Sequence, residues 1–416
     1  MTTPSNIGGF ERAEHRDLGV DPVRLRRLDT HLDAYVADGR LAGWQVAVLR
    51  SGHLAHLASG GHQDREAGRT VEPDAIWRIY SMTKAITSVA AMTLWEQGRF
   101  ELKDPVSRFL PEFADGRVWR SGSVTLPAYE PITEPMAMWH LMSHTAGLTY
   151  GFMYAHPVDE MYRRAGFEWG VPPDADLAEV VHRLAALPLL FQPGAEWNYS
   201  MSIDVLGRVI EVITGQPLDA ALRALVLEPL GMGDTGFWCP PEQAHRLAVL
   251  YGAHPRTRSA TRLDAAGAAA LSPPAAFLGG GGLVSTMGDY LRFTEMLRRG
   301  GELDGVRVLG PRTVDLMCAN HLPGGADLTQ IGRPLFAETA FDGVGFGLLG
   351  SVTLDPAATK TGGSVGDVAW GGAASTTFWV DRSEDLCVVF MTQLLPSSTH
   401  PLRSQLRQLV YQALVD

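Results

Sequence analysis

The residues best suited to chemistry are a serine and a lysine spaced as Ser81-x-x-Lys84. They follow an apolar run that predicts a short strand over 75–79, and they open an Ala-rich stretch that predicts a helix over 83–97. Positions i and i+3 share a helix face, so the amine would lie within reach of the hydroxyl. A serine needs a base to become a nucleophile, and a buried lysine has a lowered pKa. The alternative is a capping serine followed by a surface lysine.

Lysine is rare in this sequence. Lysine and arginine together number 35 among 416 residues, yet the only lysines are Lys84, Lys103 and Lys360. A guanidinium stays protonated and cannot accept a proton, whereas an amine can. The lysine at position 84 therefore indicates that an amine is needed there.

Two further segments contain residues suited to the same chemistry. Tyr199 precedes a predicted helix over 203–213, and its phenol could share a proton with a lysine, although most tyrosines are core residues. The segment Trp370-Gly371-Gly372-Ala373 has a strand-like context. Its glycines would let a substrate approach closely and the next N–H could face an oxyanion, unless the segment is simply a bulge.

Together, Ser81-x-x-Lys84, Tyr199 and Trp370-Gly371-Gly372 resemble, in order and spacing, the three motifs of the serine β-lactamase and penicillin-binding-protein superfamily. Within it, the chain most resembles the family VIII carboxylesterases, relatives of the class C β-lactamases. Segments 79–84, 141–148 and 280–286 add to the resemblance, which extends from about residue 20 to the end.

The resemblance implies a role for each matching position. Ser81 would be the nucleophile, and Lys84 and Tyr199 the proton-transfer pair. The backbone N–H groups of Ser81 and Ala373 would form the oxyanion hole. The substrate would be bound by Trp370, Gly371, Gly372 and Tyr150.

Two departures from the class C pattern indicate the substrate. Met201 stands where that pattern has an asparagine, and Trp370-Gly371-Gly372 stands where it has Lys-Thr-Gly. Both remove polar groups that would hold an amide and a carboxylate, which favours neutral esters. We therefore expect a serine carboxylesterase for short- to medium-chain acyl esters. The alternatives are a β-lactamase or D-amino-acid peptidase, and an acyltransferase that uses the same acyl-enzyme.

Three other motif matches compete with this interpretation. Lys360-Thr361-Gly362 is a literal Lys-Thr-Gly, but the strand expected after that motif follows Trp370 instead. Residues 362–366 match the G-x-S-x-G elbow of α/β-hydrolases around Ser364, with Asp381, Asp385 and His400 downstream, but no helix follows the serine. Residues 345–350 match G-x-G-x-x-G, again without the following helix that a dinucleotide site needs.

These residues must be positioned by strands from both ends of the chain. The periodicity predicts helices over 23–36, 83–97, 178–187, 203–213, 218–227, 289–298 and 402–415. Strands are predicted over 44–49, 54–58, 75–79, 346–354, 369–372, 376–380 and 386–392, and irregular stretches over 125–135 and 150–173. We expect an α/β (α+β) fold, β-lactamase-like, with an antiparallel sheet flanked by helices. Its domains would be 15–85 with 275–416 (sheet), 86–274 (an inserted helical domain) and 1–14 (an N-terminal arm).

The composition and the absence of certain motifs argue against several other functional classes. The net charge of −11 argues against a nucleic-acid or acidic-membrane binder. Residues 1–20 lack the apolar run of a signal peptide, and three scattered cysteines fit reduced thiols, so a cytoplasmic location is expected. Without an HExxH, neither a metal nor a cofactor is predicted. The expected partner is a small-molecule ester, and the oligomeric state is left open.

Overall fold

The computed structural model describes residues 6–333 and 336–416, so part of the predicted N-terminal arm lies outside the described residues. Its centre is an eight-stranded sheet that is antiparallel throughout. In spatial order the strands are β14 (Val344–Phe346), β15 (Ser351–Thr353), β16 (Val368–Gly371), β17 (Thr377–Asp381), β18 (Leu386–Thr392), β3 (Gly43–Arg50), β4 (His53–Asp64) and β5 (Arg69–Thr70). The predicted β-lactamase-like fold class is confirmed.

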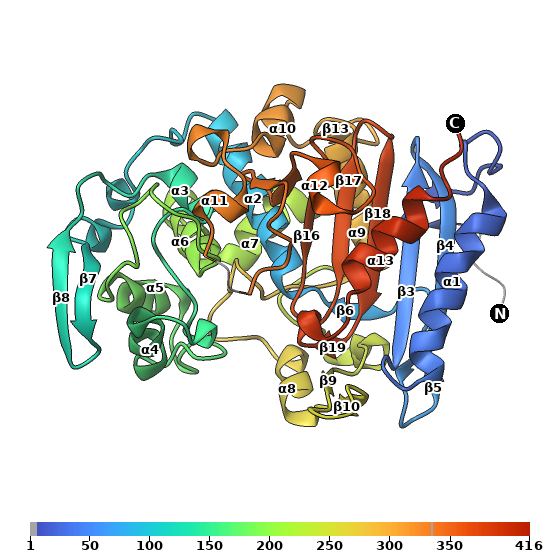
Figure 1. Cartoon of the computed structure of the whole chain (residues 1–416), viewed down its shortest axis with the longest axis horizontal. Helices are drawn as coiled ribbons and strands as arrows, with labels where there is room; N and C mark the ends of the chain where they lie inside the picture. The colour runs from blue at the N-terminus through green and yellow to red at the C-terminus, as the bar shows by residue number, and fades with distance from the viewer. Residues whose placement is uncertain (1–5, 334–335) are drawn as a thin grey trace.

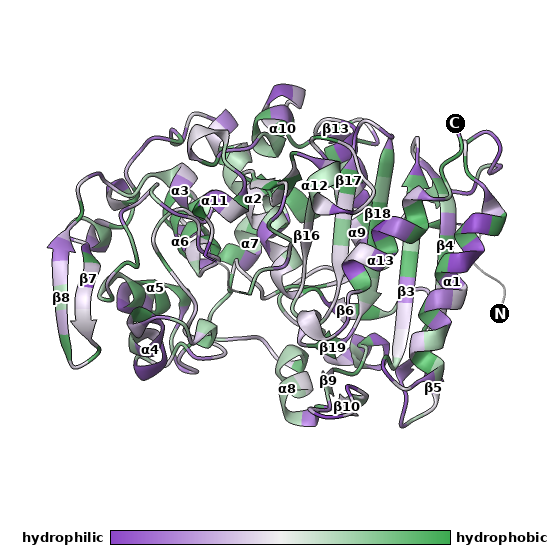
Figure 2. Cartoon of the chain, in the orientation of Figure 1, coloured by the Kyte–Doolittle hydropathy of each residue, from purple (hydrophilic) through white to green (hydrophobic). Residues whose placement is uncertain are grey.

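The two ends of the chain meet where β18 pairs with β3, with Val388 opposite Val48. Every residue of both strands is buried, and β18 consists almost entirely of hydrophobic residues (Figure 2). Successive side chains of a strand point to opposite faces. Accordingly Val388 belongs to one hydrophobic cluster, and its neighbours Cys387 and Val389 belong to the other. The sheet therefore separates two cores.

Helices cover both faces of this sheet. The helices α1 (Pro22–Ala37) and α13 (Leu402–Tyr411) pack side by side on one face (Figure 1), with α9 (Met287–Arg298) against the other. Asp21 caps α1 by accepting hydrogen bonds from the N–H groups of its first turn. The first described strands, β1 (Asn6–Ile7) and β2 (Phe10–Glu11), and the C-terminus lie on the sheet side of the molecule.

The helices that follow β5 and precede β14 in the sequence include those that form the other side of the molecule (Figure 1). Their centre is α2 (Thr83–Glu96), which is buried along nearly its whole length and contacts α6. The others are α3 (Met138–Met142), α4 (Pro157–Arg164), α5 (Leu177–Ala185), α6 (Ser202–Thr214) and α7 (Leu218–Leu222). Small and apolar residues fill most of this buried helix, and Lys84 is the one charged side chain among its buried residues.

Several sequence-based expectations about local structure are wrong. Residues 125–135, expected to be irregular, contain strand β8 (Leu126–Pro131), which pairs with β7 (Arg117–Ser123). This hairpin is mostly exposed, so it lacks the alternating apolar pattern that would predict it. The single strand expected over 346–354 is two strands, β14 and β15, because Gly347 donates its N–H to the Gly350 carbonyl and closes a tight turn.

The segment 150–173, also expected to be irregular, contains the short helix α4. The segment 86–274 is not wholly helical either, since β9 (Tyr251–Ala253) and β10 (Ala260–Arg262) form a small sheet with β19 (Leu394–Leu395). The division into a sheet domain and an inserted helical domain stays a prediction.

The packing of α1 on the sheet leads to a stability prediction. Leu28 is 0% exposed in the cluster beneath α1, whereas Val23 on the same helix is 59% exposed. Leu28→Ala should lower the free energy of unfolding by about 2 to 5 kcal/mol, because it leaves a cavity in a close-packed core. The matched control Val23→Ala should change it by less than about 0.5 kcal/mol. Urea unfolding followed by circular dichroism measures both, and equal losses would contradict this packing.

Candidate active site

A small two-stranded sheet holds the predicted nucleophile. Strand β6 (Ile76–Arg78) pairs with β11 (Val284–Thr286), and the Ile79 N–H donates to the Leu283 carbonyl. The next residue, Tyr80, has a φ of 43°, in the left-handed region that non-glycine residues rarely adopt. The chain turns there into a single 3₁₀ turn, Tyr80–Met82, and α2 follows from Thr83. Ser81 therefore lies in a strained turn at the start of a buried helix.

Three predicted residues converge at this point. The Tyr199 hydroxyl donates a hydrogen bond of 2.5 Å to Ser81 Oγ, and Lys84 Nζ lies 3.3 Å from the same oxygen. Nζ also lies 4.7 Å from the centre of the Tyr199 ring. All three side chains are buried, and Tyr199 comes from the segment just before α6. The hydroxyl of Ser81 is thus in contact with both a phenol and an amine.

The Lys84 amine has two further partners, neither of them a carboxylate. Nζ donates to the Gly280 carbonyl at 2.5 Å and to the Tyr150 hydroxyl at 3.0 Å. Behind Gly280, the Asp204 carboxylate accepts the N–H of the same glycine at 2.8 Å. Tyr150, expected among the substrate-binding residues, is therefore placed against the lysine.

Burial lowers the pKa of Lys84 to about 8, and the negative charges of Asp204 and Glu338 limit the fall. The same burial raises the pKa of Tyr199 well above its usual value, and the Glu338 charge acts in the same direction. The pKa of Tyr150 is raised as well, again chiefly by burial. Near neutral pH the site therefore holds protonated phenols beside an amine that can lose its proton.

The Trp370-Gly371-Gly372 segment lies beside the turn that carries Ser81. It forms the end of β16, and the Trp370 ring makes an edge contact with the Tyr199 ring at 5.4 Å. A side chain on Gly372 would come within 2.4 Å of the Ile79 carbonyl oxygen, so only glycine fits there. Among the described residues, no group accepts a hydrogen bond from the N–H of Ala373, which follows.

Aromatic rings extend from the lysine toward the surface. The Tyr150 ring stacks on Phe152 at 4.7 Å, and Phe152 stacks on Trp169 at 5.3 Å. Trp169 is 76% exposed, whereas Tyr150 packs against the buried core. This aromatic column of three rings, Tyr150, Phe152 and Trp169, provides an apolar surface that extends from Lys84 to the surface of the molecule.

Comparison with known proteins identifies the family of this chain. A β-lactamase family model matches residues 28–412. The chain belongs to the β-lactamase family. It is 36% identical over 405 residues to Esterase EstB from Burkholderia gladioli, covering 92% of this chain and 94% of that protein. It is 28% identical over 407 residues to a lovastatin esterase from Penicillium rubens, covering 92% and 96%.

Among solved structures, the chain resembles EstCE1, described as a hydrolase with promiscuous acyltransferase activity. The TM-score is 0.79 at 29% identity, over 94% of this chain and 99% of that one. The resemblance inferred from the three motifs is confirmed, and the chain is a serine hydrolase of the β-lactamase family.

The competing motifs do not have the surroundings that their chemistry needs. Lys360 lies in an exposed turn, and its Nζ donates to the Ala357 carbonyl. Ser364 leads into strand β16 without an intervening helix, so it is not a nucleophile elbow. Residues 345–350 span the β14–β15 turn, which offers no helix N-terminus for a phosphate.

Sequence reasoning missed Asp204 and Glu338, the two carboxylates whose charges act on Lys84. Asp204 lies in the first turn of the helix after Tyr199, and Glu338 lies outside any helix or strand. Asp204 follows Tyr199 by five positions, but Tyr199 lies before the helix, so no helical spacing relates the two residues. Nothing in the sequence around Glu338 indicates a charge near the site.

His144 and Met201 lie close to the same centre. His144 shares a hydrogen bond of 3.1 Å with the Ser200 hydroxyl, and burial together with the Lys84 charge lowers its pKa. This agrees with the expected structural role in a turn. Met201, at the asparagine position, is buried at the start of α6.

Residues 6–333 and 336–416 contain neither a metal-ligand cluster nor a membrane-spanning helix. No group of three or more His, Cys, Asp or Glu side chains there could hold a metal ion. No helix in that part of the chain is long and apolar enough to cross a bilayer.

The lowered pKa of Lys84 predicts how the reactivity of Ser81 depends on pH. An amine accepts the serine proton only when neutral, and its neutral fraction rises as pH increases through its pKa of about 8. The rate of Ser81 labelling by a fluorophosphonate should therefore rise between pH 7 and 9 and then level off. Lys84→Met should be slow and lose this rise, whereas Lys103→Met, on an exposed lysine, should keep it. A wild-type rate that is independent of pH over this range would contradict the assignment.

Proposed function

We propose that this chain is a serine carboxylesterase that hydrolyses short- to medium-chain acyl esters through an acyl-enzyme on Ser81. One observation carries the proposal: the Ser81 hydroxyl lies 2.5 Å from the Tyr199 hydroxyl and 3.3 Å from the Lys84 amine. A serine between a phenol and an amine of lowered pKa is equipped to lose its proton as it attacks a carbonyl.

In the proposed reaction the Lys84–Tyr199 pair moves the proton. Ser81 Oγ attacks the ester carbonyl carbon while neutral Lys84 accepts the hydroxyl proton. The proton then passes through the Tyr199 phenol to the leaving alkoxide, so that an alcohol departs and an acyl-enzyme remains. Water attacks the acyl carbonyl by the same route, which releases the acid and restores the serine.

The tetrahedral intermediate needs hydrogen-bond donors for its oxyanion. We assign this role to the backbone N–H groups of Ser81 and Ala373. The free N–H of Ala373 and the contact of Gly372 with the Ile79 carbonyl support this pairing, because they place the turn after β16 next to the nucleophile. Donors fixed in a buried site stabilise a developing charge more than water does.

The surroundings of Ser81 favour an apolar acyl group. Trp370, Phe152 and Trp169 offer aromatic surface, and Met201 replaces the amide side chain of the class C pattern. The relatives whose names describe an activity include two esterases, which supports ester hydrolysis over β-lactam or peptide hydrolysis.

Acyl transfer is the second candidate. EstCE1, of similar fold, is described as having promiscuous acyltransferase activity, and an acyl-enzyme can be attacked by an alcohol instead of water. The two outcomes differ only in the nucleophile of the second step. Product analysis in the presence of a competing alcohol separates them.

The nucleophile is tested with two serine variants. Ser81→Ala should lower kcat for p-nitrophenyl butyrate by about 10⁴-fold or more, since no acyl-enzyme can form. Ser364→Ala, in the competing G-x-S-x-G match, should keep wild-type kcat. The opposite pattern would show that the elbow serine is the nucleophile. Turnover of nitrocefin faster than that of the ester would support a β-lactamase instead.

The aromatic column is tested with a series of acyl chain lengths. Phe152→Ala should lower kcat/KM for p-nitrophenyl octanoate by about tenfold relative to p-nitrophenyl acetate, because a longer chain loses apolar contact. Tyr129→Ala, in the exposed hairpin far from Ser81, is the matched control and should leave the ratio unchanged. An unchanged ratio in Phe152→Ala would exclude the column from acyl binding.

A further inference from the structure

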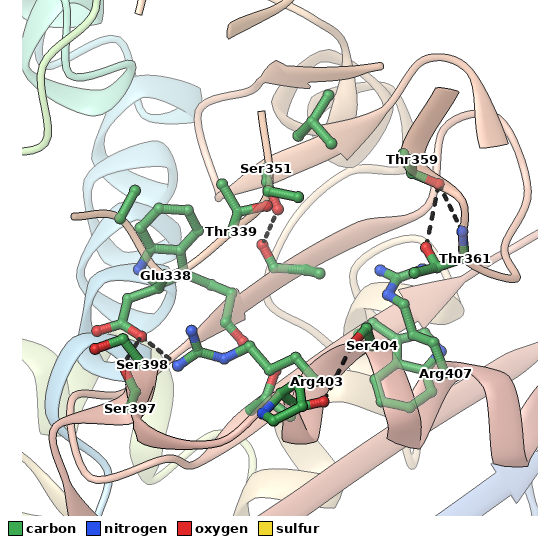
Figure 3. A pocket seen from close by; sticks show the side chains of 18 of the residues that line it. Glu338, Thr339, Ser351, Thr359, Thr361, Ser397, Ser398, Arg403, Ser404 and Arg407 are labelled. Atoms are coloured by element: carbon green, nitrogen blue, oxygen red, sulfur yellow. Dashed lines mark hydrogen bonds and ion pairs between the residues drawn. The ribbon is translucent and has the colours of Figure 1, made fainter. Parts of the chain in front are cut away.

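A cavity of about 420 Å³ lies against the sheet face that carries α13. Its floor is formed by residues of β15, β16 and β17, and its wall by the first two turns of α13 (Figure 3). The apolar side chains of α13 that belong to the core cluster are Leu402, Leu406 and Val410, which pack there with strands β3, β17 and β18. The face over β15 and β16 is thereby left open as a hollow lined by both polar and apolar side chains.

Two arginines of the cavity wall are paired with carboxylates. Glu338, with Ser397, pairs with Arg403 at one end, while Arg407 lies at the other (Figure 3). Arg407 makes two hydrogen bonds to the buried Asp367 carboxylate, of 2.7 and 2.9 Å. The charges of these two arginines are thus neutralised, whereas Arg258, an exposed residue that also lines the cavity, has no ion pair among the described residues.

Several hydroxyl groups of the wall have already donated their hydrogens. Each of four hydroxyls that line the cavity donates to a backbone carbonyl, at 2.7 to 3.1 Å, and accepts no hydrogen bond from the described residues. They are those of Ser351, Thr377, Thr399 and Ser404. A hydroxyl has one hydrogen and two lone pairs, so what remains toward the cavity is acceptor capacity. The wall therefore suits a ligand that donates hydrogen bonds.

Two groups at the Glu338 end lack a partner among the described residues. Glu338 is 2% exposed, and its Oε1 accepts no hydrogen bond. The Nε of Arg403 donates none. A buried polar atom without a hydrogen-bond partner costs free energy. A ligand that offers one donor and one acceptor side by side would therefore be favoured at this end. A hydroxyl group supplies both, whereas a carboxylate only accepts and an ammonium only donates.

We propose that this cavity binds a neutral, hydroxyl-rich ligand such as a saccharide. Its hydroxyls would donate to the wall oxygens and Glu338 and accept from Arg403. The ligand is either a free polyol or the sugar part of an acylated sugar, and the second case rests on the proposed esterase function. The site adjoins the third motif, because Arg403 Nη2 donates to the Gly372 carbonyl at 3.3 Å and Trp370 lines the cavity.

Binding is tested without catalysis by saturation-transfer NMR with methyl α-D-glucopyranoside. Wild type should give saturable transfer, and the double variant Ser351→Ala with Ser404→Ala should bind about tenfold more weakly, since two acceptors are lost. The matched control is Ser123→Ala with Thr125→Val, a hydroxyl pair in the distant hairpin turn. Absent transfer in wild type, equal affinity in the double variant, or binding of benzoate or propylammonium in place of the glucoside would overturn the proposal.

Kinetics then distinguish the two sources of the ligand. The readout is kcat/KM for an acetylated methyl glucoside divided by kcat/KM for p-nitrophenyl acetate. A ratio that falls about tenfold in the double variant would assign the cavity to the sugar part of a substrate. An unchanged ratio with weakened glucoside binding would assign it to a free polyol. If wild type hydrolyses neither ester, the esterase proposal fails while the NMR result still decides the binding site.

Discussion

The burial of one amine is the constraint on which the site depends. Lys84 is 3% exposed, so its charged form loses the solvation of water, and its pKa falls to about 8. Its polar partners are a carbonyl, a phenol and the serine oxygen, none of which fixes a positive charge as a contacting carboxylate would. The Asp204 carboxylate accepts the N–H of Gly280 and does not contact the amine. Its negative charge limits the lowering of the Lys84 pKa, but the amine can still lose its proton.

That constraint explains features far from Lys84 in the sequence. A side chain on Gly280 would come within 2.6 Å of the Asp204 carboxylate, so this glycine, within the run Gly279–Gly282, is what allows the carboxylate to approach. The run leads into β11, whose pairing with β6 fixes the turn that carries Ser81. The pairing of β18 with β3 closes the sheet that holds the third motif beside that turn. Local strain at Tyr80 persists because all of these contacts hold it.

The resemblance of the sequence motifs to a known family predicted the fold class and the convergence of Ser81, Lys84 and Tyr199, whereas local helix spacing relates only Ser81 to Lys84. It could not predict that Tyr150 contacts the amine, since that contact joins residues 66 positions apart through a loop. The β7–β8 hairpin was missed because an exposed hairpin is held by backbone pairing and has no apolar period. Glu338 was missed because its ion pair with Arg403 spans 65 positions.

The alternation of side chains along β16 shows how one strand serves two different surfaces. Trp370 points to the core that holds Tyr199, whereas the preceding Ala369 faces the cavity beneath α13. The face that holds Tyr199 is apolar and aromatic, and the opposite face presents hydroxyl oxygens and ion pairs. The two faces meet at Gly371 and Gly372, where the strand ends and Arg403 contacts the backbone. Contacts on both faces therefore fix the position of this glycine pair.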